Sequence, residues 1–141
     1  MKTAAVIYRS STGTTRRFAE AIAAYLRTQG VETQVSSVGD FDMTMLANVD
    51  YLLLGCWTNG LFVVLQHPDE PWLAFARDLP SGVRARVGLF TTYKLLTGSM
   101  FARMRAALAG KTATSSLELK SRDGRLSERY QRALDQFVAA G

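Results

Sequence analysis

Hydrophobic residues follow two different spacings along this chain. Short apolar runs bounded by turn residues, such as residues 4–8 and 50–55, predict buried strands. Between such runs, apolar residues recur every three or four positions, as at Phe18, Ile22 and Leu26, and this spacing predicts an amphipathic helix. The two spacings alternate to the end of the chain, so the sequence predicts strands that alternate with helices.

The boundaries of these elements follow from the same spacings together with glycine and proline. We predict strands over residues 4–8, 31–38, 50–55, 86–91 and 113–119. We predict helices from the turn at 10–15 to about residue 30, and over residues 71–79, 100–108 and 126–140. Residues 56–60 follow the most apolar strand and are predicted to be a loop.

Strands that alternate with helices favour right-handed parallel crossovers. We therefore predict an α/β fold, a three-layer α/β/α sandwich whose five-stranded parallel sheet has the order 2-1-3-4-5. The length of 141 residues is that of a single domain, which we place at residues 1–141. In such sheets ligands bind outside the carboxyl ends of the strands. The loops after the first, third and fourth strands should then meet at one site.

The turn after the first strand consists almost wholly of hydroxyl residues and one glycine. Gly13 lets the backbone approach a ligand without an intervening Cβ. The helix that follows directs its unpaired N–H groups to the same place, which favours an anion there. We predict that the turn binds a phosphate, with hydroxyl donors from Ser10, Ser11, Thr12, Thr14 and Thr15.

The turn has two other interpretations. A GxxxxGK[ST] loop for a nucleoside triphosphate needs a lysine that this turn lacks, so a monophosphate ester is the better fit. Alternatively, Thr12 or Thr14 caps a helix that would form without any ligand, since Ser and Thr are common at that position.

The segment SSTGTT at residues 10–15 resembles the [ST]-x-T-G-x-T phosphate loop of flavodoxins, in the place where that family carries it, directly after the first strand. The alternation of strands and loops extends the resemblance along the whole chain. The resemblance implies a flavodoxin-like fold, the cofactor FMN, and binding of the FMN phosphate by this turn.

The same resemblance implies where the flavin ring lies. Aromatic side chains from the second and third loops commonly sandwich the ring in this family, and Trp57 and Tyr93 stand in those loops. Both rings could instead be loop anchors that pack on neighbouring helices. The cofactor-binding residues implied for these two loops are Trp57, Thr58, Asn59, Gly60, Thr91, Thr92, Tyr93 and Gly98.

Charge is divided unevenly between the two halves of the chain. Residues 1–76 carry 5 basic and 7 acidic side chains, whereas residues 77–141 carry 12 and 5. The basic half is compatible with an ordinary solvated face or with docking to an acidic surface on a redox partner. Flavodoxins are typically acidic, so positive charge from Lys94, Arg103 and Arg105 should make this flavin less reducing than is usual in the family.

Composition excludes several other classes of protein. No apolar run approaches the roughly 18 residues that span a bilayer, so no membrane insertion is expected. Cys56 is the only cysteine, which permits no internal disulfide and agrees with a cytoplasmic location. It is interpreted as a buried small hydrophobe. A single histidine, His67, rules out a multi-histidine metal site. Nucleic-acid binding by the basic half is disfavoured but stays open, because aromatic and basic residues are not interleaved in a recognition pattern.

The sequence therefore predicts an FMN-binding, flavodoxin-like protein that transfers electrons between redox partner proteins. The flavin performs the chemistry, so no catalytic side chain is predicted. Two alternatives stay open: an FMN-dependent NAD(P)H oxidoreductase of the quinone-reductase kind, and a flavodoxin-fold interaction module without a cofactor.

Overall fold

Five parallel strands form the central sheet of the computed structural model, which describes residues 1–61 and 64–140. The sheet has the order β2-β1-β3-β6-β7, and each neighbouring pair is parallel. This is the predicted order 2-1-3-4-5 for the five parallel strands. Their bounds are β1 Thr3–Arg9, β2 Glu32–Ser37, β3 Tyr51–Trp57, β6 Arg86–Thr92 and β7 Leu117–Ser121.

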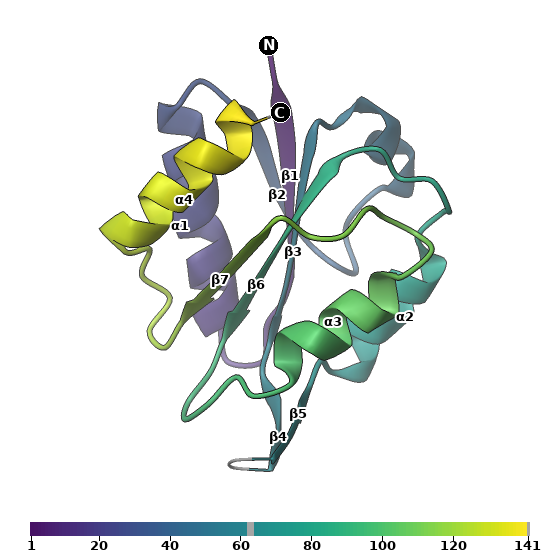
Figure 1. The fold of residues 1–141 in the computed structure, drawn as a ribbon, viewed down its shortest axis with the longest axis vertical. Coiled ribbons are helices and arrows are strands. Elements are labelled where there is room, and N and C mark those ends of the chain that lie inside the picture. The colour runs from purple at the N-terminus through teal and green to yellow at the C-terminus, as the bar shows by residue number, and fades with distance from the viewer. Residues whose placement is uncertain (62–63, 141) are drawn as a thin grey trace.

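Helices cover both faces of the sheet, which confirms the predicted three-layer arrangement (Figure 1). Helices α1 (Thr14–Thr28) and α4 (Glu128–Ala139) lie on one face. Helices α2 (Glu70–Asp78) and α3 (Met100–Leu108) lie on the other, with a short 3₁₀ helix η1 (Met43–Asn48) between β2 and β3. Each layer of helices encloses its own hydrophobic core against the sheet.

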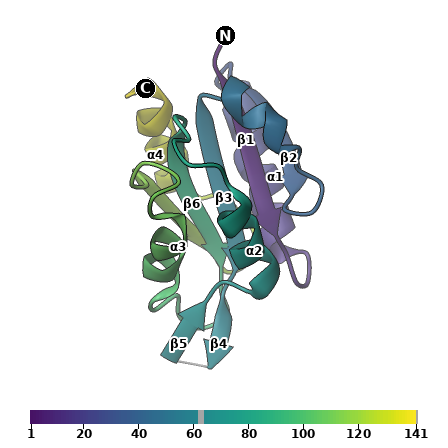
Figure 2. The same cartoon turned by 90° about the vertical axis from the view of Figure 1, so that its right-hand side faces the viewer.

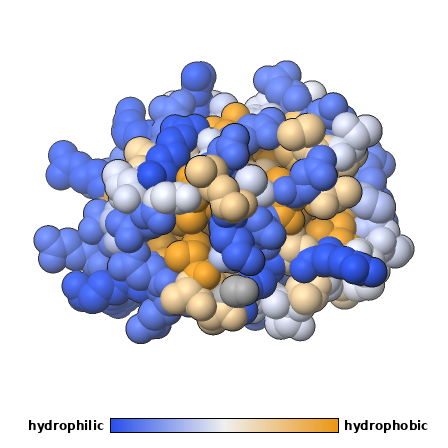
Figure 3. All heavy atoms as spheres, turned by 90° about the horizontal axis from the view of Figure 1, so that it is seen from above, coloured by the Kyte–Doolittle hydropathy of each residue, from blue (hydrophilic) through white to orange (hydrophobic). Residues whose placement is uncertain are grey.

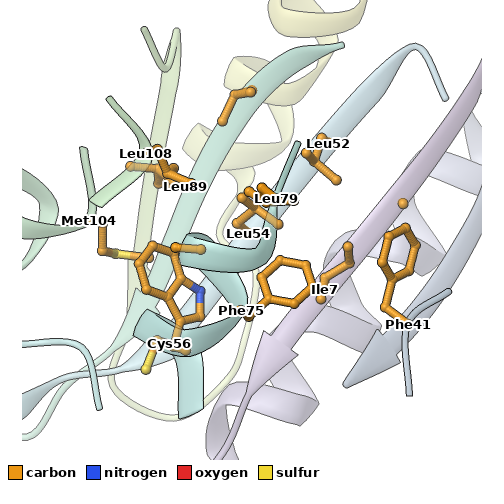
Figure 4. Packing of buried hydrophobic residues seen from close by; sticks show 14 of the residues in the cluster. Ile7, Phe41, Leu52, Leu54, Cys56, Phe75, Leu79, Leu89, Met104 and Leu108 are labelled. Atoms are coloured by element: carbon orange, nitrogen blue, oxygen red, sulfur yellow. The ribbon is translucent and has the colours of Figure 1, made fainter. Parts of the chain in front are cut away.

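The alternation of side chains along β3 divides these two cores. Leu52 and Leu54 point to the layer of α2 and α3, while Tyr51 and Leu53 point to the layer of α1 and α4. All four are at least 99% buried. Figure 4 shows the first core, where strand side chains such as Leu54 meet those of the helices. Full burial of one leucine contributes roughly 1.5–3 kcal/mol, so packing in these two cores stabilises the sheet.

Most predicted boundaries lie within one or two residues of the observed ones, and the last strand and the last helix show why some differ. The last strand begins at Leu117, not at residue 113, because its pairing with β6 starts at Gly88 opposite Leu117. The last helix begins at Glu128, two residues later than predicted. Ser127 precedes it with an extended backbone, and its side chain accepts a hydrogen bond from the N–H of Tyr130, as an N-cap does.

The predicted loop at residues 56–60 is the main error. Cys56 and Trp57 continue β3, since they pair with Thr91 and Thr92 of β6. After them a small antiparallel hairpin leaves the sheet, formed by β4 (Asn59–Leu61) and β5 (Val64–His67). Figure 2 shows this hairpin extending beyond the carboxyl ends of the large sheet. Hydrophobic spacing does not reveal this hairpin, because each of its strands is only three or four residues long.

The carboxyl ends of β1, β3 and β6 therefore meet at one end of the molecule, beside the hairpin (Figures 1 and 2). Figure 3 shows the opposite end, where hydrophilic side chains project around the outline and hydrophobic ones lie between them. Within residues 1–61 and 64–140, no helix has the length and apolar character needed to cross a bilayer.

Candidate functional site

A cavity of about 630 Å³ opens at the carboxyl edge of the sheet. The turn after β1, the end of β3 and the loop after β6 contribute to it, as the topology predicts. Its volume lies within the roughly 300–1,000 Å³ of small-molecule sites. The predicted residues that line it are Ser11, Thr12, Thr14, Thr15, Trp57, Thr58, Asn59, Thr92 and Tyr93.

Helix α1 starts at this cavity with a glycine at its N-cap. This residue, Gly13, has a left-handed backbone with a φ of 96° and no side chain that could cap the helix. The alternative that Thr12 or Thr14 caps the helix is therefore wrong. Helices α2 and α4, by contrast, are capped by Asp69 and Ser127.

Ser10 holds the turn in shape from outside the cavity lining. Its Oγ accepts hydrogen bonds from the N–H groups of Gly13, at 3.0 Å, and Arg16, at 3.3 Å. Thr12 and Thr14 both line the cavity beside the first turn of α1. This end of the cavity therefore presents neutral donors at the positive end of a helix dipole.

Threonine hydroxyls join the three segments that meet at the site. Thr15 of α1 and Thr92 of β6 share a buried hydrogen bond of 2.5 Å between their Oγ1 atoms. Thr91 donates to the carbonyl of Cys56 at 2.6 Å and lies 2.8 Å from the Thr58 hydroxyl. Thr91 is fully buried behind the cavity, so its role in the structure is to join the ends of β3 and β6.

Trp57, the last residue of β3, forms one wall of the cavity. Its indole Nε1–H donates to Asp69 Oδ2 at 2.8 Å, and Arg9 Nε donates to the same oxygen at 2.8 Å. Neighbouring Cys56 is fully buried, and burial raises the pKa of its thiol far above the ordinary value. The interpretation of Cys56 as a buried small side chain is confirmed.

Tyr93 follows β6 and lines the cavity beside two cations. Lys120 Nζ lies 5.6 Å from the centre of its ring, and Arg122 Cζ lies 5.3 Å from it. Both distances are those of cation–π contacts. The Tyr93 N–H donates to the Ser121 carbonyl at 3.2 Å, which joins this loop to the end of β7.

Arg122 also lines the cavity, although it is not among the predicted site residues. It could have been predicted, because Arg122 directly follows the fifth parallel strand, and that strand ends at the same edge of the sheet as the three strands before the other loops. Lys94 lines the cavity as expected, but Arg103 and Arg105 do not. Both belong to α3, where Arg103 donates to Ser99 and Arg105 pairs with Glu118.

Leu95 and Leu96 complete the mouth of the cavity, with exposed fractions of 51% and 49%. Gln66 of β5 lies on the lining as well, so the unpredicted hairpin contributes to the site. Gly98 has a φ of 49° and contacts the Gln66 side chain so closely that a Cβ would collide with it. Gly98 therefore supports the lining without belonging to it.

Of the predicted site residues whose surroundings the structure describes, four are not among those that line the cavity: Ser10, Gly13, Thr91 and Gly98. Gly60 lies in β4. In the described part of the chain, no group of three or more His, Cys, Asp or Glu side chains could hold a metal ion.

Comparisons with known proteins agree with this geometry. The sequence model of the flavodoxin family matches residues 6–110. A flavodoxin from Clostridium beijerinckii is 33% identical over 88 residues, which are 62% of this chain and 62% of that protein, so the match spans less than two-thirds of the relative.

Solved structures show the same fold at low sequence identity. The two-electron reduced flavodoxin of Megasphaera elsdenii superposes with a TM-score of 0.74 at 21% identity, over 98% of this chain and 99% of that one. A short-chain flavodoxin associated with a bacterial microcompartment gives 0.72 at 22% identity, over 99% and 95%. Flavodoxin 1 of Bacillus cereus gives 0.68 at 20% identity, over 98% and 95%.

Proposed function

Because this chain belongs to the flavodoxin family, we propose that it binds FMN in the cavity at the carboxyl edge of its sheet and carries electrons between partner proteins. Flavodoxins bind FMN and transfer electrons to redox partners. One observation supports the proposal most: a single cavity is lined both by the start of a helix whose N-cap is a glycine and by two aromatic side chains from separate segments.

The residues at the helix end fit a phosphate ester. Ser11, Thr12 and Thr14 line this end, and Gly13 keeps a Cβ out of the turn. A phosphate dianion there would receive hydrogen bonds from hydroxyls and from N–H groups of the first turn, together with the favourable helix dipole. Ser10 and Thr15 would hold this turn in place through their own hydrogen bonds.

The residues at the other end fit a planar ring. Trp57 and Tyr93 would contact the two faces of the isoalloxazine, each stacked pair adding roughly 0.5–1.5 kcal/mol beyond the burial of area. Thr58, Asn59, Gly60 and Thr92 would present hydroxyl, amide and backbone groups to its polar edge. Thr91 and Gly98 would support these segments from behind. When bound, FMN supplies the electron-accepting chemistry, and the protein supplies binding, orientation and charge.

The partner in this proposal carries an acidic docking surface. Lys94 and Arg122 stand at the cavity mouth beside the exposed Leu95 and Leu96. Of the described residues that line the cavity, none is an aspartate or glutamate. An apolar centre with a basic rim is complementary to an acidic rim, which would accelerate encounter at low ionic strength. We also place the protein in the cytoplasm, with one buried cysteine as the support.

The absorbance spectrum of the purified protein tests the cofactor. After incubation with FMN and removal of the free flavin by ultrafiltration, we expect FMN to stay with the protein and its fluorescence to be quenched by the stacked rings. Riboflavin, which lacks the phosphate, should bind more weakly. Protein that retains no FMN would overturn the proposal in favour of an interaction module. Rapid NADPH oxidation without a separate reductase would overturn the carrier role in favour of an oxidoreductase.

A further inference from the structure

One buried carboxylate joins the two halves of the cavity. Asp69 precedes α2 and is 7% exposed. Its Oδ2 accepts hydrogen bonds from Arg9 Nε and Trp57 Nε1, both at 2.8 Å. Its Oδ1 accepts from the N–H of Trp72 at 3.3 Å and lies 3.5 Å from the Cys56 thiol. Three segments, β1, β3 and the start of α2, therefore meet at one side chain.

We propose that Asp69 is a positioning residue that fixes the orientation of the Trp57 indole at the cavity wall, with Arg9 as its counter-ion. The inference rests on the proposed function only in assigning that wall to a flavin ring. The orientation itself is a property of the protein without any cofactor.

A comparison of the two tryptophans shows that the hydrogen bond from Trp57 to Asp69 does more than give an indole N–H a partner. Trp72 is fully buried, and its Nε1 lacks a hydrogen-bond partner among the described residues. Trp57 is only half-buried and lines an open cavity, where water could accept its hydrogen bond. Yet Trp57 is the one that donates to a buried carboxylate. An indole has a single N–H donor, so a short bond to a fixed acceptor sets the direction of the whole ring.

Capping of α2 does not explain the arrangement either. The cap uses Oδ1, which accepts from the N–H of Trp72, whereas Arg9 and Trp57 both bind Oδ2. Arg9 ends β1 and immediately precedes the phosphate turn. In the sheet it stands opposite Cys56, next to Trp57. Through Asp69, the strand that carries the phosphate turn is thus connected to the strand that carries the ring wall.

This connection should weaken in acid. Burial by itself raises the pKa of Asp69, but the hydrogen bonds from Arg9, Trp57 and Trp72 and the charge of Arg9 outweigh it and lower the pKa below its usual range. Among the described residues, the titratable groups that contact Asp69 are Arg9 and the Cys56 thiol, and burial keeps that thiol neutral. A lowered pKa means that the bond is intact at neutral pH and above, and is lost as the pH falls through the folded-state value.

The first test uses the protein without flavin. The chain has two tryptophans, so a ¹H–¹⁵N spectrum contains two indole signals, and Trp57→Phe identifies the one from Trp57. In Asp69→Asn, where asparagine still caps α2, we expect the Trp57 indole proton to move upfield and to exchange faster with solvent. The matched control is Asp42→Asn, because Asp42 caps η1 in the same way and does not line the cavity. An unchanged Trp57 signal in Asp69→Asn would overturn the proposal.

The second test is a double-mutant cycle on FMN affinity. Asp69→Asn should weaken FMN binding by about tenfold, the effect of one strong hydrogen bond. In a Trp57→Phe background, which keeps a ring but has no N–H, the same change should have almost no further effect. Equal losses in both backgrounds would mean that Asp69 does not act through Trp57. If the wild type itself fails to bind FMN, the proposed function fails, while the indole signals still decide the positioning role.

Discussion

The two ends of the cavity are built in different ways. The helix end comes from one continuous turn, residues 10–15, whose hydroxyls and N–H groups are neutral. The ring end is assembled from β3, the hairpin, the loop after β6 and the loop after β7, and it carries Lys94 and Arg122. A local motif is thus sufficient for the proposed anion site, whereas the ring site depends on the whole sheet edge. The two ends should respond differently to substitution, to charge and to the chemical form of the ligand.

The largest effect is expected from a negative charge at the helix end. In Thr12→Asp, the carboxylate would stand beside the FMN phosphate, and repulsion at about 4 Å amounts to several kcal/mol near a protein surface. We expect FMN affinity to fall roughly 100-fold or more, measured by fluorescence titration. Riboflavin affinity should change little because riboflavin has no phosphate. Thr114→Asp, at an exposed threonine outside this cavity, is the control. Equal losses for both flavins would contradict the assignment of the two ends.

Removal of a ring wall should have the next largest effect. Trp57→Ala deletes the indole that lines the cavity, and we expect a loss of about tenfold or more in affinity from the lost stacking and burial. FMN and riboflavin should lose the same factor, because both carry the ring. A loss confined to FMN would place the phosphate, and not the ring, beside Trp57.

A smaller effect is expected on the reduction potential. Arg122 is a cation on the cavity lining, and positive charge beside the flavin favours the state that holds the added electrons. Arg122→Gln should therefore lower the potential of bound FMN by roughly 30–60 mV. For a one-electron step, a shift of about 60 mV corresponds to a tenfold change in the equilibrium constant. Arg103→Gln serves as the control, since Arg103 is not on the lining. Equal shifts in both variants would indicate a general effect of net charge.

The smallest effect is expected from Gly98, which contacts Gln66 of the cavity lining. Gly98→Ala forces an alanine into a left-handed conformation and towards the Gln66 side chain. We expect a loss of about 1–2 kcal/mol in the free energy of unfolding and a decrease of a few fold in flavin affinity. Denaturant unfolding and titration measure the two. Gly39→Ala, where φ is ordinary and a Cβ has open space, should change neither. Unaltered affinity in Gly98→Ala would separate Gly98 from the site.

Most of the fold could be predicted from the sequence because its signals are local. Apolar runs marked the strands, and Gly30 and Pro80 stood just beyond helix ends. The hairpin could not be predicted, since β4 and β5 are short and stabilised by pairing with each other. The late start of β7 is likewise a matter of register against β6.

The candidate site shows the same difference between local features and contacts between segments. By itself the sequence determined the parallel architecture, the hydroxyl turn at the start of α1 and the two aromatic residues near the carboxyl ends of β3 and β6, because spacing and residue type encode these features locally. Only the tertiary structure decided that Ser10 supports the turn from behind, that Arg122 reaches the cavity, and that Asp69 directs the Trp57 indole. The Ser10 contacts are local but irregular, whereas those of Arg122 and Asp69 join separate segments that become neighbours only when the strands align at one edge of the sheet.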